Sequence, residues 1–148
     1  MITDEQVLDR YPVAPIDRDN VDLYRGYLER ELRLNRCDEC GMWRHPPRPI
    51  CPRCWSGRIV PTPVSGRGVV HLMTVLHVGP PAPGIDYREG HPVVTVQLEE
   101  AADLRFSASL VDASRKQRCI GMPVDLTWVD RGGAPVPAFR PVQTPGVT

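Results

Sequence analysis

The sequence has no excess of either charge and no long hydrophobic run. Its 148 residues include 18 basic and 18 acidic side chains, so the formal net charge is zero, and Lys116 is the only lysine. Without a basic excess, no overall field draws the chain to nucleic acid or to an anionic membrane. No apolar stretch approaches the ~20 residues that a transmembrane helix needs. We therefore expect a soluble, cytoplasmic protein that does not span a membrane.

The sequence also lacks the patterns of common catalytic sites. It has no paired carboxylates, no glycine-rich phosphate loop and no Ser-x-x-Lys run. Cys119 lies beside Arg118, a charge that lowers thiol pKa values, but a small buried side chain at the start of a strand is the favoured interpretation. His71 and His77 stand too far apart on one strand to share a metal, and His91 is expected in a loop. These absences predict a chain without catalysis of its own.

Four other cysteines carry the strongest chemical signal. Cys37 and Cys40 form one C-x-x-C pair, and Cys51 and Cys54 form a second pair ten residues further on. Gly41 follows the first pair and supplies the positive-φ freedom that such a tight turn needs. Four thiolates saturate a tetrahedral Zn²⁺ and leave no open position for water or substrate. The spacing therefore predicts a structural zinc.

Other uses of these thiols stay open at the level of sequence. Two disulfides would need an oxidising compartment, but residues 1–10 do not resemble a signal peptide, and Cys119 would be left over. A redox C-x-x-C pair normally occurs singly and before a helix, whereas three prolines stand between these pairs. An iron–sulfur cluster or a rubredoxin-type iron would use the same ligands, and His45 could replace one of them. Ligand type and spacing favour zinc on four cysteines.

Changes in residue pattern divide the chain into three parts. Residues 1–34 carry helical signals, residues 35–62 form the zinc ribbon, and residues 63–148 form an all-β domain with a C-terminal tail. The ribbon is too small to bury enough surface alone, so metal binding supplies about 10 kcal/mol or more of its folding energy. Its expected hydrophobic complement is Met42, Trp43, Ile50 and Trp55.

Two helices are expected before the ribbon. Thr3 and Gln6 form a capping-box pattern for a short helix that Pro12 ends. A second helix begins at an N-cap at residue 19 or 20 and runs to about Arg30. Its broad apolar face, which includes Tyr24 and Tyr27, packs on its own domain or on a partner protein.

The all-β part predicts a five-stranded barrel. Alternation of apolar and polar residues marks strands at 68–78, 93–98, 104–110, 124–128 and 136–142, with one helical turn at 112–118. Five strands with a short helix between the third and the fourth are typical of the OB-fold. Pro137 and Pro141 place the last strand at a sheet edge. Gly66, Gly68 and Gly121 stand where a closing barrel needs sharp bends.

Several stretches together form a recognisable pattern. The first runs Leu34-Asn-Arg-Cys-Asp-Glu-Cys-Gly-Met-Trp-Arg-His-Pro-Pro-Arg-Pro-Ile-Cys-Pro-Arg-Cys54, and others are Val64–Val70, Ile120–Val124 and Val136–Pro141. With these stretches the chain resembles the DUF35 (ChsH2-like) family. The resemblance covers about residues 19–142. It implies a helical N-terminus, a rubredoxin-like zinc ribbon and an OB-fold, in the stand-alone form without an attached hydratase domain. One departure is His71-Leu-Met73, where the family usually has aromatic residues in the first barrel strand.

The resemblance also implies a function. Proteins of this family accompany thiolase-superfamily enzymes, which include thiolases, 3-hydroxy-3-methylglutaryl-CoA synthases and lipid-transfer-protein-like aldolases that cleave acyl-CoA side chains, sterols among them. The OB-fold member is generally not the catalyst; it supports the assembly and can border the acyl-CoA site. We therefore expect an α2β2 heterotetramer, two catalytic chains flanked by two copies of this one.

Two surfaces are candidates for binding the partner or CoA. On the ribbon, Arg44, Arg48 and Arg53 suit bidentate contacts with carboxylates or phosphates, although each alone is also typical of a solvated surface. Between the first two barrel strands, the loop 79–91 is longer than most hairpin connections and carries Tyr87 and Arg88.

Two other functions remain as alternatives. Zinc ribbons and OB-folds both bind single-stranded nucleic acid, but that function needs a basic groove with aromatic platforms. The barrel strands hold only Phe106, Trp128 and Phe139, all expected to face inward. A stand-alone acyl-CoA binder without a protein partner is the second alternative.

Overall fold

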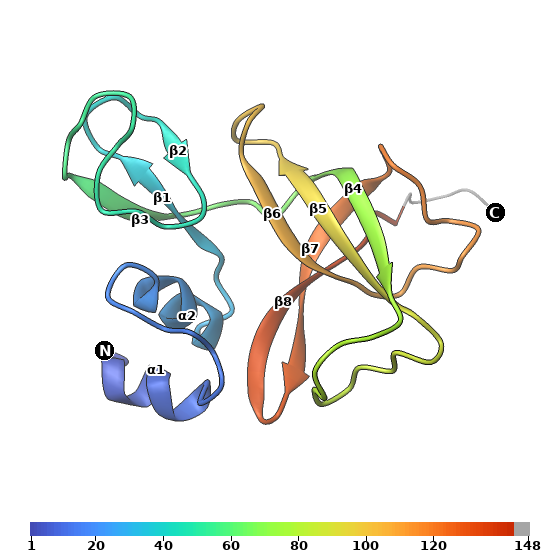
Figure 1. Ribbon diagram of the computed structural model, residues 1–148. Coiled ribbons are helices and arrows are strands. Elements are labelled where there is room, and N and C mark those ends of the chain that lie inside the picture. Colours follow the sequence, from blue (N-terminus) through green and yellow to red (C-terminus); the bar gives the residue numbers. More distant parts are fainter. Residues whose placement is uncertain (144–148) are drawn as a thin grey trace. The chain divides into compact units, whose positions relative to one another are not determined.

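The computed structural model describes residues 1–143 (Figure 1). Contacts divide the chain into two compact units, one of residues 1–65 with 130–136 and one of residues 66–129 with the segment after 136. The fold is mostly β with two short N-terminal helices, as the sequence predicts. The last five residues of the expected barrel domain, 144–148, lie outside the described residues. No helix in the described part is long and apolar enough to cross a membrane.

Helix α1, Asp4–Arg10, begins with the capping box that the sequence predicts. The Thr3 side chain accepts from the Gln6 backbone N–H at 3.2 Å, and the Gln6 side chain accepts from the Thr3 backbone N–H at 2.8 Å. Each bond satisfies a donor that the first helical turn leaves without an intrahelical partner. The helix buries one side chain, Val7, completely.

Helix α2, Val21–Leu28, is shorter than expected. Its N-cap is Asn20, but the side chain makes no cap hydrogen bond; it accepts from the Asp17 backbone N–H and donates to the Pro15 carbonyl instead. Arg30, the expected end of the helix, has a φ of +54° and terminates it. Because the Arg30 N–H donates to Tyr27 and the next N–H to Gly26, the end is a Schellman motif.

Three tyrosines join the helical elements of the first unit. The ring centroids of Tyr24 lie 5.3 Å from Tyr11 and 5.1 Å from Tyr27. The Tyr11 hydroxyl donates to the Pro135 carbonyl at 2.5 Å, so the start of strand β8 (Ala134–Pro141) is tied into this unit. Burial raises the pKa of Tyr11 to about 12. The core of this unit also contains buried aliphatic side chains, Leu32 and Leu34 among them, each 1% exposed.

The ribbon is a three-stranded antiparallel sheet in the order β2-β1-β3. Its strands are β1 (Arg33–Cys37), β2 (Trp43–Arg44) and β3 (Ile59–Pro63). One cysteine pair lies between β1 and β2, and the other lies between β2 and β3 (Figure 1). The sheet therefore brings together two turns that are distant along the chain.

The second unit contains a closed five-stranded barrel in the order β4-β5-β6-β8-β7. The strands are β4 (Gly68–Leu76), β5 (His91–Leu98), β6 (Arg105–Leu110), β7 (Pro123–Arg131) and β8 (Ala134–Pro141). Its core includes Val94, Val96 and Phe139, each 0% exposed. The last strand is not at an edge, which corrects the expectation from its prolines: β8 lies between β6 and β7, and its pairing with β6 is parallel.

Two further expectations about the barrel are wrong. Residues 112–118 form no helical turn; a turn closed by the Gln117 N–H and the Ser114 carbonyl takes its place. The Ser114 N–H also donates to the Gln117 side chain at 2.9 Å, which closes the same turn. Trp128 is only half-buried, whereas Phe106 and Phe139 are buried and meet edge to face at 6.3 Å.

Close approach requires glycine at the start of β4. A Cβ at Gly68 would lie 2.3 Å from the Gln97 carbonyl oxygen and 2.6 Å from Val96 Cγ1. Gly66, just before the strand, has a φ of +80°, a conformation in which a side chain is strained. The chain can therefore bend sharply where it enters the barrel.

Candidate functional site

Four cysteine sulfurs converge in the ribbon. Cys37 and Cys54 sulfurs lie 3.5 Å apart, Cys40 and Cys51 sulfurs lie 3.6 Å apart, and all four lie within 4.8 Å of one another. A disulfide would require about 2.05 Å, so none of these thiols is paired covalently. Tetrahedral Zn–S bonds of about 2.3 Å place sulfurs about 3.8 Å apart. The cluster therefore fits a single zinc ion.

Two knuckles with the same backbone pattern position the thiols. In the first, the Gly41 N–H donates to the Cys37 carbonyl at 2.9 Å; in the second, the Trp55 N–H donates to the Cys51 carbonyl at 2.9 Å. Gly41 and Trp55 both have positive φ angles, +76° and +65°. The two turns thus present their cysteine pairs in equivalent ways.

The knuckle backbone also prepares the thiols for ionisation. Backbone N–H groups of the turn, first among them that of Cys54, lower the pKa of Cys51 to about 6. Those of Cys40 and Glu39 lower the pKa of Cys37 in the same way. For Cys54, the Ser56 N–H lowers the pKa, but burial and the three neighbouring thiols outweigh it and raise the pKa to about 12. Such a cluster binds a cation more readily than it holds four negative charges.

His45 is not part of the cluster. The only group of three or more possible ligands among residues 1–143 consists of the four cysteines. His45 is half-buried, and this burial lowers its pKa to about 4. The histidine is therefore neutral at physiological pH.

The ribbon does not bury the hydrophobic complement expected for it. Ile50 is 50% exposed and Trp55 is 81% exposed, whereas Met42 and Trp43 are half-buried. Arg36 lies over the Trp43 ring at 5.3 Å. The ribbon is held by its sheet and by the sulfur cluster rather than by a core, so its two most apolar knuckle side chains remain on the surface.

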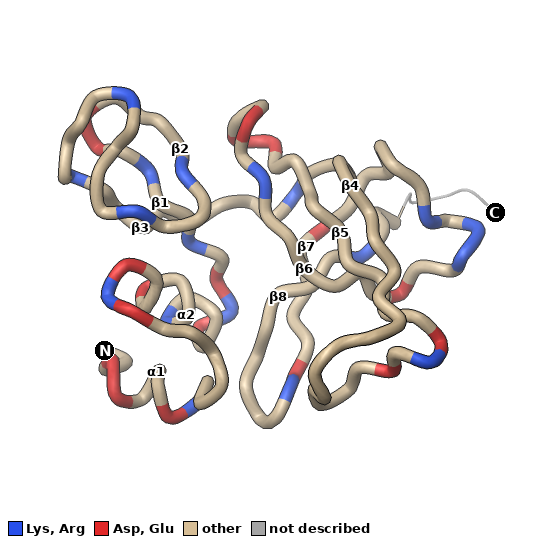
Figure 2. The backbone as a smooth tube through the Cα atoms, in the orientation of Figure 1, with Lys and Arg blue, Asp and Glu red and all other residues tan. Residues whose placement is uncertain are grey.

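Basic residues occur at several points along the backbone of the ribbon (Figure 2). Arg48 and Arg53 are exposed, and Arg44 on β2 is half-buried with its Nε inside the protein. None of the three forms an ion pair in the described structure; the ribbon's acidic residues, Asp38 and Glu39, both lie near Arg58.

The aromatic candidates are less accessible than expected. Tyr27 is 7% exposed and belongs to the tyrosine cluster, so it offers no surface to a partner; Tyr24 is half-buried. In the loop after β4, the Tyr87 hydroxyl donates to the Pro80 carbonyl at 2.9 Å, so the ring folds back on its own loop. Arg88 beside it is exposed.

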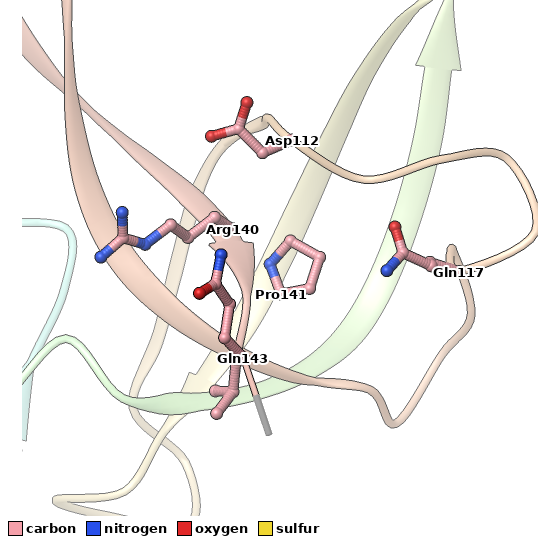
Figure 3. A pocket seen from close by; sticks show the side chains of 6 residues that line it. Asp112, Gln117, Arg140, Pro141 and Gln143 are labelled. Carbon is pink, nitrogen blue, oxygen red and sulfur yellow. The ribbon is translucent and has the colours of Figure 1, made fainter. Parts of the chain in front are cut away.

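One polar pocket borders the barrel near residue 143 but does not form a convergent site. It has a volume of about 450 Å³ and includes Asp112, whose φ is +56°. Figure 3 shows that the Gln117 side chain points toward Pro141, whereas the Arg140 side chain extends away from Gln117. They therefore cannot hold a common small ligand as placed.

A second surface of the barrel was missed by sequence reasoning. β4 pairs with β7 only at Gly68 and Val69, and beyond that point the described strands pair with it on one side only. Leu72 is 56% exposed, and a hollow of about 540 Å³ lies beside the strand. Its lining is Met73, Val75, His77, Glu89, Arg115, Arg118 and Ile120. The sequence signal for this exposed surface was the run of apolar residues on both faces of the strand at 68–78.

Cys119 is exposed, which corrects the expectation of a buried thiol. It lies in the loop before β7 rather than at the entry to the strand. At that position no neighbouring strand covers it.

Two family models match consecutive parts of the chain. The ChsH2 rubredoxin-like zinc ribbon domain matches residues 27–60, and the ChsH2 C-terminal OB-fold domain matches residues 61–129. These matches agree with the ribbon sheet and the barrel described above.

Relatives of known sequence fall into two groups by length. A DUF35 domain-containing scaffold protein of Methanocaldococcus jannaschii is 34% identical over 76% of this chain and 78% of its own length. A probable enoyl-CoA hydratase alpha subunit of Thermomonospora curvata is 34% identical over 88% of this chain. The 3-oxo-4,17-pregnadiene-20-carboxyl-CoA hydratase alpha subunit of Mycobacterium tuberculosis is 34% identical over 76%. The chain spans only 40% and 34% of these two hydratase subunits.

Solved structures give the same result. A chain of the Ltp2-ChsH2(DUF35) aldolase is 34% identical, with a TM-score of 0.77 over 86% of this chain and 98% of that one. A DUF35 protein of unknown function from Sulfolobus solfataricus is 11% identical with a TM-score of 0.55, which supports the fold alone. With its zinc-ribbon and OB-fold domains and its scaffold relatives, this chain belongs to the DUF35 (ChsH2-like) family.

Proposed function

We propose that the chain is a non-catalytic subunit that binds and supports a thiolase-superfamily enzyme acting on acyl-CoA substrates. The partner is a lipid-transfer-protein-like aldolase or a thiolase, and the substrate class includes fatty-acyl or sterol side chains. The complex is an α2β2 heterotetramer.

One observation carries this proposal. The chain matches 98% of a chain of the Ltp2-ChsH2(DUF35) aldolase at 34% identity. A likeness of that extent includes both the ribbon and the barrel, which supports the proposal that this chain also belongs to an aldolase assembly. The names of the hydratase alpha subunits among the relatives also refer to acyl-CoA substrates. The name of the M. tuberculosis protein specifies a steroid acyl-CoA.

In this proposal Cys37, Cys40, Cys51 and Cys54 hold a structural Zn²⁺. Four sulfurs within 4.8 Å leave no ligand position for water or substrate. The metal fixes the two knuckles, and the exposed ribbon residues Arg48 and Arg53 then face the partner in defined places. Two further candidate contacts, Arg44 and Tyr24, are half-buried. Tyr87 and Arg88 are candidate contacts in the barrel loop.

The nucleic-acid alternative has less support. Phe106 and Phe139 are 4% and 0% exposed, so the barrel strands present neither ring as a platform for bases. A gel shift with single-stranded DNA at low salt tests this alternative directly; tight, salt-sensitive binding would favour it.

Co-expression with thiolase-superfamily chains encoded beside this one tests the main proposal. We expect co-purification, a size-exclusion mass equal to two copies of each chain, and catalytic activity that requires both. Failure to co-purify with any such chain would contradict the proposal. Acyl-CoA titration of the chain alone tests the remaining alternative. Tight binding that is unchanged by the catalytic chain would identify a stand-alone acyl-CoA binder.

A further inference from the structure

The two knuckles differ at one position, where the backbone conformation favours glycine. Gly41 and Trp55 each follow the second cysteine of their pair, and each donates the same hydrogen bond. Both have φ angles in the left-handed region, +76° and +65°. Glycine adopts this region without penalty, whereas a side chain crowds the following carbonyl oxygen. The second knuckle thus carries a bulky ring at a position that costs free energy of folding.

Nothing in the ribbon compensates for this cost. The Trp55 side chain is 81% exposed, and the structure described here gives it no ring partner, in contrast to Trp43 beneath Arg36. An exposed indole also orders water that burial would release. Ile50, just before the same knuckle, is 50% exposed and widens the apolar surface. A side chain that costs backbone strain and gains no burial in the free chain is typical of a residue retained for binding.

The charges around this ring indicate the nature of its partner. Residues 35–60 contain five arginines and two acidic residues, and four thiolates on one Zn²⁺ add −2, so this segment of an overall neutral chain carries a net charge of +1. Both acidic residues lie near Arg58, and Arg53, in the same knuckle as Trp55, forms no ion pair within the described residues. An exposed apolar ring in the same knuckle as an arginine without a carboxylate partner complements an apolar pocket bordered by carboxylates.

We propose that Trp55 anchors the ribbon in an apolar, carboxylate-rimmed pocket of the catalytic partner. This inference rests on the proposed function and names the contact that forms the complex. Tryptophan is among the residues that most often dominate an interface, with arginine beside it. A second copy of the chain is a poorer occupant, because two equal positive patches repel each other.

The substitution Trp55→Gly tests the proposal with effects of opposite sign. In the free chain loaded with zinc, the variant should unfold at a higher temperature than the wild type, because the left-handed position then holds glycine. Its affinity for the co-purified thiolase-superfamily chain should fall at least about 30-fold in a titration calorimetry or surface-binding assay.

Two more variants separate the ring from the backbone and from the charge. Trp55→Ala keeps a Cβ at the left-handed position, so it should lose affinity to the same extent without the gain in unfolding temperature. Arg53→Glu should weaken binding and reduce its dependence on salt. Val78→Gly, at another highly exposed apolar residue, should leave affinity unchanged as the matched control.

Each outcome decides between the two proposals. Wild type that binds the catalytic chain with the same affinity as Trp55→Gly overturns the role of Trp55 and leaves the proposed function intact. Lower thermal stability of Trp55→Gly shows that the ring is structural and also overturns this inference. Wild type that binds no catalytic chain overturns the proposed function, and self-association that Trp55→Gly abolishes would replace the partner with a second copy.

Discussion

At the residue scale, Cys37 and Cys51 are each 2% exposed and receive N–H groups from their own turns. Each turn holds its leading sulfur at a position set by short-range hydrogen bonds. The second cysteine of each pair then closes the cluster. Loss of one thiol would therefore weaken metal binding and disturb the backbone conformation of both turns.

Cys37→Ser should release the metal, because a serine hydroxyl does not replace a thiolate on zinc at neutral pH. We expect the zinc content measured by elemental analysis to fall from one ion per chain to near zero, with loss of ordered ribbon structure. Cys119→Ser, which changes an exposed thiol outside the cluster, should keep full zinc. Full zinc and full stability in Cys37→Ser would show that the ligand assignment is wrong.

His45 gives the ribbon a pH dependence. Burial lowers the pKa of His45 to about 4, below the value of about 6.5 in an unfolded chain. The unfolded state therefore binds more protons between these pH values, and stability is complete above pH 6.5 and falls as the pH drops toward 4. At about 1.4 kcal/mol per pKa unit, the full loss is on the order of 3–4 kcal/mol.

The variant His45→Gln should flatten this dependence in urea unfolding measured from pH 7 to pH 4.5. His77→Gln, at an exposed histidine, serves as the control and should retain the slope of the wild type. Equal slopes in His45→Gln and wild type would mean that the acid sensitivity comes from the metal thiolates alone.

At the scale of elements, the barrel closes where β4 begins. Gly68 pairs with Leu98 on one side and Val124 on the other, so both neighbours meet this strand at one residue. The Gln97 carbonyl approaches so closely that no Cβ fits. Beyond this point β4 no longer pairs with β7, and its apolar side chains are exposed. The stability of the barrel therefore depends on the residues at the start of β4.

Gly68→Ala should destabilise the chain by about 1–3 kcal/mol, since a methyl group at this position forces backbone apart. The free energy of unfolding from chemical denaturation measures the effect. Gly57→Ala is a matched control, because nothing lies within 4 Å of the added methyl. If the two variants were equally stable, the close approach at the barrel entry would not exist in solution.

At the scale of the whole molecule, two compact units differ in what holds them together. The barrel unit has a closed sheet around buried aliphatic and phenylalanine side chains. The ribbon has three short strands, exposed apolar residues and the sulfur cluster. The metal therefore matters far more to one unit than to the other.

Removal of metal with a strong chelator should loosen the ribbon selectively. Hydrogen–deuterium exchange should accelerate across residues 33–63, while the amides of Val94 and Val96 in the barrel stay protected. Binding of the catalytic partner should be lost at the same time and return when zinc is restored. Uniform acceleration across both units would show that they unfold as one.

The sequence alone determined the features that depend on neighbours along the chain. The cysteine spacing defined the metal cluster, the Thr3–Gln6 pair defined the start of α1, and alternation defined the strands, because each depends on a few consecutive residues. Only the tertiary structure decided that β8 lies between β6 and β7 despite its prolines, that α2 stops at the left-handed Arg30, and that Trp55 is exposed. Strand order and burial depend on which distant segments meet, and no local pattern in the chain records that choice.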